Sequence, residues 1–377
     1  MNTAPPKSIP LTRPCFPEAM RQAILRDLDR VLSSGRLMMG PYQEKLEAAF
    51  RELTETAHAV SLNAATTGLQ IALRHCGAKD REVLVPAASF VTDVSACLFE
   101  GATPVLVDID PETLALDLDD LERKVSPRTV AIIWVHLTGF IAANHDAIRN
   151  FARDRGLFLI EDASHAHGAS VDGRPAGSLG DVGIFSFYPT KIMTSGTGGM
   201  LVTEDAELAR FAREMRLFGK ESESGEIVHL GNDWFLDEIR ACVAAHQVAG
   251  LADQLARRRA AATYYWRRFA NRPGLRVLSP ADAHAPAWYQ YPVFLDAAFD
   301  HDRIVAALKA ENIAAKRIYK PVHREAVFRG FDTGTLGAAE TMLERSLCLP
   351  MFGDITEQET AAVADALLRA IAAQGAR

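Results

Sequence analysis

The chain has 377 residues, of which 48% are hydrophobic and 24% are charged, and its formal net charge is −7 at pH 7. This length allows one large domain and a smaller one, and the composition is that of an ordinary globular protein. The acidic balance, without a basic run, argues against a nucleic-acid-binding surface. No apolar stretch in the sequence is long enough to cross a bilayer.

The N-terminal stretch MNTAPPKSIPLTRP is polar and proline-rich and has no apolar core region, so it is not predicted to be a secretory signal. The cysteines are five in number and lie far apart, without a CxxC pair: Cys15, Cys76, Cys97, Cys242 and Cys348. Such a set argues against a disulfide framework or a zinc site and for inert core thiols in a reducing compartment. We therefore expect a cytoplasmic protein without a metal site.

Apolar runs alternate with helix-like segments between about residues 57 and 203. The runs occupy residues 58–63, 82–89, 103–110, 129–137, 157–165, 182–187 and 199–205. Because Val, Ile and Leu are continuous in these runs rather than strictly alternating, the strands are predicted to be buried on both faces. This pattern is typical of an α/β fold with a mainly parallel central sheet.

The pattern changes after about residue 236. Residues 237–271 are Ala-rich and lack proline, which predicts one long helix or two joined helices. Shorter strand-like and helix-like segments follow, up to a final helix over residues 356–373. We predict a large α/β domain over residues 1–245, including the N-terminal segment, and a smaller C-terminal α+β domain over residues 246–377.

Ligands of open α/β sheets bind beyond the carboxyl ends of the strands. The first run ends in SLNAATTG, where a helix is predicted to open at Thr66 or Thr67. Small residues, hydroxyls and free N–H groups at a helix start can hold a phosphate, although the same residues also serve as ordinary helix caps. Phe90 ends the second run and is either a core residue or a platform for a planar ring.

Two further strand ends carry polar side chains that are unusual beside buried runs. Glu161, Asp162, His165 and His167 follow one another closely, and a buried carboxylate is costly unless a cation meets it. These residues lack a convincing spacing of metal ligands. Lys191 lies just beyond the next strand, and a buried lysine there would have a lowered pKa and become nucleophilic.

One rim of the sheet is therefore expected to hold a phosphate site, a carboxylate and a lysine. Pyridoxal phosphate needs all three: its aldehyde bonds to a lysine, its ring nitrogen pairs with a carboxylate, and its phosphate fits a helix N-terminus. We predict that Lys191 forms a Schiff base with this cofactor.

The sequence also resembles the DegT/StrS type of sugar aminotransferases over nearly its whole length. The likeness begins at SSGRLMMGPYQEKLEAAF and ends near LPMFGDIT, and its specific part is EDASHAHGA followed by FSFYPTK. The resemblance implies the aspartate-aminotransferase-like fold of type I pyridoxal-phosphate enzymes and a homodimer whose active sites lie at the subunit interface.

The same resemblance implies roles for single residues. Lys191 would form the internal aldimine and carry the proton between the substrate carbon and the cofactor. Asp162 would pair with the ring nitrogen, and Phe90 would stack on the ring. His165 would lie beside the phenolic oxygen of the cofactor. The phosphate would be held by Ala65, Thr66 and Ser186.

Two further site residues follow from the resemblance less directly. For Asn232 the surrounding sequence departs from the family pattern, and for His323 the match is looser. The family often places Asn and Arg in a segment that reaches the partner's phosphate, and here Asp233 and Phe235 stand at those places. Asn232 is then the candidate that takes over the phosphate contact. His323, in YKPVH, matches a late histidine that faces the sugar-nucleotide pocket.

The implied activity is a ping-pong transfer of an amino group from L-glutamate, or glutamine, to a nucleotide-linked keto-deoxysugar. Products of this kind supply the amino sugars of polysaccharides or antibiotics. The alternatives are a related nucleotide-sugar dehydratase, in which His typically replaces the lysine, and a catalytically silent ligand-binding relative. A dinucleotide-binding oxidoreductase would need GxGxxG after the first strand, and NAATTG does not supply it.

Overall fold

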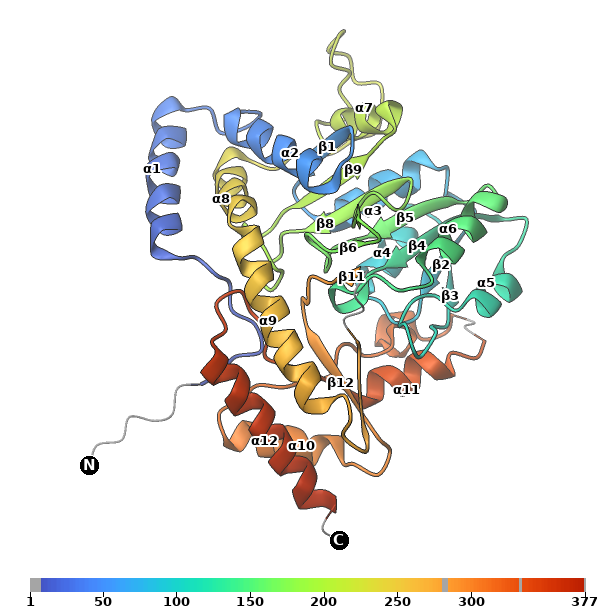
Figure 1. Cartoon of the computed structure of the whole chain (residues 1–377). Coiled ribbons are helices and arrows are strands. Elements are labelled where there is room, and N and C mark those ends of the chain that lie inside the picture. The colour runs from blue at the N-terminus through green and yellow to red at the C-terminus, as the bar shows by residue number, and fades with distance from the viewer. Residues whose placement is uncertain (1–7, 280–283, 332–333, 376–377) are drawn as a thin grey trace.

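The computed structural model describes residues 8–279, 284–331 and 334–375. Residues 1–7, which begin the stretch predicted not to be a secretory signal, lie outside the described residues. The described chain forms a large α/β part and a smaller C-terminal part (Figure 1). None of its described helices combines the length and the apolar character that crossing a membrane requires.

A seven-stranded sheet forms the centre of the large part. In spatial order its strands are β1 (His58–Leu62), β9 (Gly199–Thr203), β8 (Val182–Ser186), β5 (Phe158–Asp162), β4 (Thr129–Val135), β2 (Glu82–Pro86) and β3 (Thr103–Val107). The pairs from β8 to β3 are parallel, and only β9 runs antiparallel to its two neighbours in this sheet. All seven predicted runs form strands, and the mainly parallel sheet is confirmed.

Helices cover both faces of this sheet, as the continuous apolar runs predict. One face packs against α3 (Ala65–His75), α4 (Val91–Phe99) and α7 (Ala206–Met215). The other face packs against α2 (Pro41–Thr54), α5 (Leu118–Lys124), α6 (His145–Asp154) and α8 (Glu238–Ala249). Successive strand residues point to opposite faces, so Leu159 joins the second core and Ile160 the first.

The N-terminal helices are joined to the body through a buried carboxylate. Helix α1 (Glu18–Ser34) lies at the edge of the molecule against α8 (Figure 1). The start of α2 has no side-chain cap of its own. Instead, the fully buried Glu238 accepts hydrogen bonds from the backbone N–H groups of Gly40, Tyr42 and Gln43. A carboxylate at a helix N-terminus satisfies free donors and interacts favourably with the helix dipole.

The Ala-rich stretch after residue 236 forms two joined helices, α8 and α9 (Leu251–Phe269), which meet at Gly250. The C-terminal part then adds an antiparallel sheet of β10 (Leu275–Val277), β12 (Tyr291–Leu295) and β13 (Ser346–Leu349). Its helices are α10 (His301–Ala310), α11 (Gly337–Arg345) and α12 (Glu357–Gly375). A third, small sheet contains β11 (His284–Ala285), β6 (Ser170–Val171) and β7 (Arg174–Pro175).

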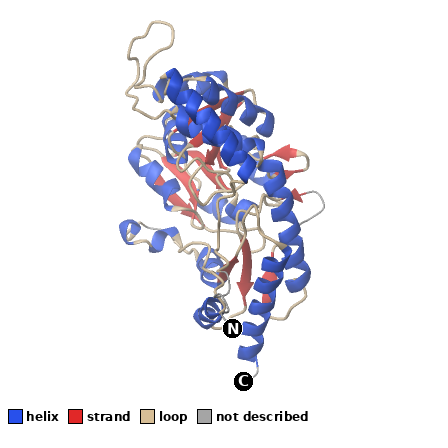
Figure 2. Ribbon diagram, turned by 90° about the vertical axis from the view of Figure 1, so that its left-hand side faces the viewer, coloured by secondary structure: helices blue, strands red, loops and turns tan. Residues whose placement is uncertain are grey.

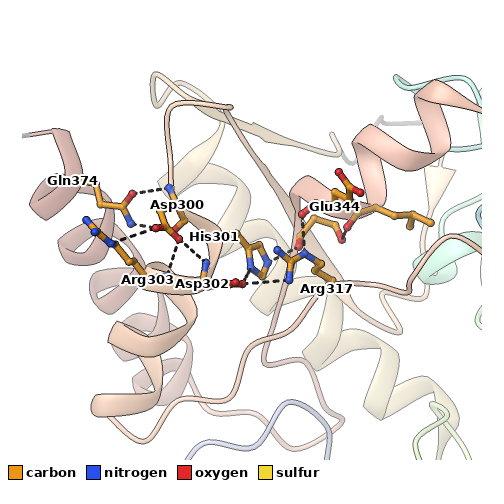
Figure 3. Close-up of polar contacts among 9 residues, drawn as sticks. Asp300, His301, Asp302, Arg303, Arg317, Glu344 and Gln374 are labelled. Carbon is orange, nitrogen blue, oxygen red and sulfur yellow. Dashed lines mark hydrogen bonds and ion pairs between the residues drawn. The ribbon is translucent and has the colours of Figure 1, made fainter. Parts of the chain in front are cut away.

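A polar network ties the helices of the C-terminal part together (Figure 3). Asp300 caps α10 by accepting from the backbone N–H groups of Asp302 and Arg303. Gln374, near the end of α12, exchanges two hydrogen bonds with the backbone of Asp300, at 2.7 and 3.1 Å. Arg317 bridges Asp302 and the backbone carbonyl of Glu344. These contacts fix α10, α11 and α12 relative to one another.

The N-terminal segment lies against the C-terminal part (Figure 1), and Figure 2 shows the molecule from the side. Ile9 and residues 312–314 exchange two backbone hydrogen bonds, and Leu11 accepts one from Met351. This packing brings Leu11 and Thr12 to the cavity described below. The predicted domain boundary after residue 245 stays a prediction.

Candidate active site

A cavity of about 540 Å³ opens at the carboxyl ends of the parallel strands. Its volume lies within the range of about 300–1,000 Å³ that is usual for small-molecule sites. Seven residues predicted from the sequence line it together: Ala65, Thr66, Phe90, Asp162, His165, Ser186 and Lys191. The predicted cluster of side chains at the carboxyl ends of the strands therefore lines a single cavity.

Lys191 lies five residues beyond β8, in a turn where its backbone N–H donates to Tyr188. Its Nζ lies 4.9 Å from the centroid of the Tyr289 ring and has no hydrogen bond or ion pair within the described residues. Burial lowers the pKa of Lys191 to about 8, while the charges of Asp162 and Asp93 oppose the shift. A substantial fraction of the amine is therefore neutral near physiological pH and able to act as a nucleophile.

Asp162 is the last residue of β5 and its side chain is 7% exposed, at the cavity. One carboxylate oxygen accepts a hydrogen bond of 2.9 Å from the backbone N–H of Ser164. The carboxyl of Asp93, on α4, is a hydrogen-bonding neighbour of the Asp162 side chain. The carboxylate is thus held by the protein on one side and open to a ligand on the other.

His165 forms the wall between the large part and the C-terminal part. Its ring stacks on Tyr289 with centroids 4.2 Å apart, and its Nε2 lies 3.0 Å from the hydroxyl of Tyr319. Burial, with Lys191 nearby, holds the pKa of His165 well below its usual range, so the imidazole is neutral. Its Nδ1 is buried and has no partner in the described chain, which leaves it free for a ligand oxygen.

The start of α3 forms the opposite end of the cavity. The helix begins at Ala65, one residue earlier than predicted, and no side chain caps it. Gly199 makes this approach possible, because a Cβ there would lie 2.5 Å from the Ala65 nitrogen. The backbone N–H groups of this first turn, with the hydroxyls of Thr66 and Ser186 beside the cavity, form a site suited to a phosphate.

Glu161 and His167 do not belong to the cavity, although they adjoin Asp162 and His165 in the sequence. Neighbouring strand residues point to opposite faces, and Glu161 accepts from His136 Nε2 at 2.6 Å and from the backbone of Gly177 at 2.6 Å. His167 is fully buried beside aromatic rings. Of these four neighbouring residues, only Asp162 and His165, the two predicted to bind the cofactor, line the cavity.

Two predicted residues lie away from the cavity of their own chain. Asn232 is exposed, and its side-chain oxygen accepts from the backbone N–H of Asp233. His323 is bound through Nε2 to Glu340 at 2.7 Å. The proposed contacts of Asn232 and His323 with cofactor or substrate stay predictions.

Sequence reasoning missed much of the wall that the C-terminal part contributes. Tyr289, Gln290, Lys316 and Tyr319 line the cavity. Residues 314–319 are among the strand-like segments predicted for the C-terminal part, but they form no strand apart from a single bridge at Lys316, so the pattern did not show which of their side chains face the cavity. Tyr319 lies four residues before His323, and this adjacency was the only available hint.

A larger depression of about 830 Å³ lies at the amino ends of the strands. Its lining includes Arg81, Arg149, Arg153 and Arg155 but no lysine. The smaller cavity is the candidate active site, because it alone of the two combines a lysine, a carboxylate and a helix start.

The comparison with known families decides the class of this protein. Residues 18–368 match the DegT/DnrJ/EryC1/StrS aminotransferase family. The chain belongs to this family. It is 36% identical over 360 residues to the UDP-N-acetyl-3-dehydro-α-D-glucosamine 3-aminotransferase of Acidithiobacillus ferrooxidans, covering 93% of this chain and 95% of the relative.

Solved structures agree. The aminotransferase TlmJ from Streptoalloteichus hindustanus superposes with a TM-score of 0.90 at 31% identity, covering 97% of this chain and all of TlmJ. DesV from S. venezuelae superposes with a TM-score of 0.88 at 34% identity, covering 95% of this chain and 98% of DesV. The protein is a sugar aminotransferase of fold type I that uses pyridoxal phosphate, as the sequence predicts.

The described residues fit this cofactor. The amine of Lys191 has no hydrogen bond or ion pair within the described residues, Nδ1 of His165 is an unsatisfied buried atom, and the uncapped start of α3 offers N–H donors. These are the groups that an aldehyde, a phenolic oxygen and a phosphate require.

Proposed function

We propose that this enzyme transfers an amino group from L-glutamate, or glutamine, to a nucleotide-linked keto-deoxysugar in a ping-pong reaction. The observation that carries the proposal is the amine of Lys191, which has no hydrogen bond or ion pair within the described part of the chain and shares one cavity with Asp162. The acceptor class is supported by the Acidithiobacillus ferrooxidans relative, whose name gives a UDP-linked 3-keto sugar as its substrate.

When bound, pyridoxal phosphate supplies an electron-withdrawing ring that stabilises negative charge on the carbon beside the transferred nitrogen. Asp162 would keep a proton on the ring nitrogen through its negative charge. Phe90 would cover one face of the ring. Thr66 and Ser186 would hold the phosphate by their hydroxyls, together with the N–H groups of the first turn of α3.

Lys191 is assigned the proton transfers of both half-reactions. As a general base its Nζ takes a proton from the α-carbon of the amino donor, and as a general acid it returns one. A pKa of about 8 suits both roles, because neither the neutral nor the charged form is scarce near pH 7–8. His165, being neutral, can offer Nδ1 to a ligand oxygen without adding charge.

We also propose a homodimer with shared active sites. Support comes from large apolar side chains that are exposed on α1, on the α1–α2 connection and on the connection between α7 and α8, which projects from the body in Figure 1: Leu25, Leu32, Leu37, Met39, Ile227, Val228 and Leu230. Exposed apolar clusters of this kind mark protein interfaces. Asn232 follows Leu230 closely and does not line its own cavity, which suits a contact with the partner's site.

The test is an assay with a panel of nucleotide-linked 3-keto and 4-keto sugars, using ¹⁵N-labelled L-glutamate and mass spectrometry of the products. The proposal expects one sugar to gain a labelled amino group in parallel with the appearance of 2-oxoglutarate. A sugar that loses water without gaining nitrogen would instead support the dehydratase. Sedimentation of the purified protein tests the dimer separately.

A further inference from the structure

Asp93 is a buried acid next to the candidate cofactor site that none of the assigned roles uses. It lies in the first turn of α4, three residues after Phe90, and its side chain is fully buried. It does not line the cavity, so it cannot touch a ligand directly. An acid in this position is costly to bury and requires a reason.

The surroundings of Asp93 are incompletely satisfied. Its Oδ2 accepts a hydrogen bond from the hydroxyl of Ser89. Its Oδ1 is buried and has no donor among the described groups around it. The side chain of Asp162, itself an acceptor when ionised, is its hydrogen-bonding neighbour. Two carboxylates facing each other leave one hydrogen bond unmade unless a proton lies between them.

The charges around the pair favour a single negative charge. Burial and then the neighbouring Asp162 raise the pKa of Asp93 well above its usual range, whereas the hydrogen bond from Ser89 and then the charge of Lys191 lower it. The other titratable groups near Asp93 are the buried thiol of Cys97, one turn along α4, and the phenol of Tyr319. Both are neutral near pH 7, so the hydrogen bond from Ser89 and the charge of Lys191 are the influences that oppose protonation of Asp93. Neighbouring carboxyl groups in a buried site favour a state in which only one of them is ionised.

We propose that Asp93 is a positioning residue that carries a proton on Oδ1 and donates it in a hydrogen bond to the carboxylate of Asp162. This contact and the Ser164 N–H hold the Asp162 carboxylate from the protein side. The pair then presents one negative charge, which matches the single positive charge of a protonated ring nitrogen. The inference rests on the role proposed above for Asp162.

The variants Asp93→Asn and Asp93→Leu separate this role from simple packing. Asn is nearly isosteric with a protonated Asp and still offers N–H donors, whereas Leu fills similar space without a donor. The full chain is studied first without cofactor, by infrared difference spectroscopy with ¹³C-labelled aspartate over a pH series. This readout is independent of the proposed function, because it needs neither cofactor nor substrate.

The wild type is expected to show the carbonyl band of a protonated carboxylic acid near pH 7, and Asp93→Asn is expected to lose it. In Asp93→Asn the proton affinity of Asp162 should be close to that in the wild type, because the Asn side chain still donates a hydrogen bond to it. In Asp93→Leu the proton affinity of Asp162 should rise by about tenfold or more, since a hydrogen bond to a charged group is lost. With cofactor bound, turnover should be close to wild type for Asn and reduced for Leu.

The proposal is overturned if the wild type lacks this band, or if Asp93→Asn behaves like Asp93→Leu. If Asp93→Leu fails to fold, the band and the turnover of Asp93→Asn still decide the matter. The proposed function fails separately: the wild type would then transfer no amino group to any sugar of the panel, while the infrared band, recorded without cofactor or substrate, would be unaffected by that outcome.

Discussion

Two neighbouring carboxylates at the end of β5 lie on opposite faces of the sheet and have opposite surroundings. Glu161 is fully enclosed, and its two oxygens accept from His136 and from the backbone N–H groups of Gly177, Leu179 and Gly180. Asp162 accepts one backbone hydrogen bond and borders the cavity. A complete set of donors makes the first carboxylate structural, whereas an open side leaves the second available for chemistry.

The largest expected effect is the loss of stability when Glu161, the enclosed carboxylate, is replaced. Replacing Glu161 by Ala should lower the free energy of unfolding by about 3–5 kcal/mol, because His136 and three backbone N–H groups lose their buried partner. Urea unfolding of the cofactor-free protein measures this. Glu161→Gln is the control and should lose less, since one acceptor oxygen remains. A change within about 1 kcal/mol for Glu161→Ala would contradict the comparison.

On the cavity side, the effect should fall on turnover rather than on stability. Asp162→Asn removes the negative charge that pairs with the ring nitrogen and should lower kcat by about 10²–10³-fold. The unfolding free energy without cofactor should change by less than about 1 kcal/mol. Steady-state kinetics and urea unfolding together test this, and a large loss of stability would mean that the two carboxylates have similar roles.

The rate at which Lys191 reacts with pyridoxal phosphate should depend on pH, and this dependence gives a second comparison of Asp162 with Glu161. Burial lowers the pKa of Lys191 from 10.5 to about 8, so its amine is mostly charged below that pH and neutral above it. The rate of pyridoxal phosphate incorporation should therefore fall about tenfold per pH unit below this midpoint, as followed by stopped-flow absorbance.

Variants of the two carboxylates should move this midpoint differently. Because the charge of Asp162 raises the pKa of Lys191, Asp162→Asn should shift the midpoint to lower pH. Glu161→Gln should leave it unchanged, since Glu161 lies on the other face. An equal shift in both variants would show that the electrostatic separation of the two faces is absent.

The smallest expected effect is that of ring stacking. Phe90→Leu should weaken cofactor affinity by about 0.5–1.5 kcal/mol, the usual contribution of an aromatic contact. Phe99→Leu, at the far end of α4, is the matched control, because Phe99 is 69% exposed and does not line the cavity. Equilibrium titration with the cofactor measures both, and equal losses would argue against a platform role for Phe90.

Most of the large part was predictable because its strands are buried on both faces. Continuous Val, Ile and Leu runs marked every strand of the central sheet, and the order of the strand ends placed Asp162 and Lys191 on one rim. The antiparallel direction of β9 was not predictable, since the run that forms it is as apolar as the runs that form the parallel strands.

Other features of the site have local causes that the sequence shows only in part. Glu161 adjoins Asp162 in the sequence, but the two-residue period of a strand sends it to the other face. Asp93 escaped notice because nothing in the sequence of α4 shows that its side chain meets Asp162. Residues such as Asn232 cannot be placed from one chain if their contact belongs to a partner subunit.

The most direct test of the central role of Lys191 is the absorbance spectrum of the protein with pyridoxal phosphate, before and after L-glutamate is added. The wild type should show the visible band of the lysine-linked cofactor, and glutamate should bleach it to the amine form. Lys191→Ala should never form the lysine-linked band. A wild type that binds no cofactor, or a Lys191→Ala variant with an unchanged spectrum, would contradict the account.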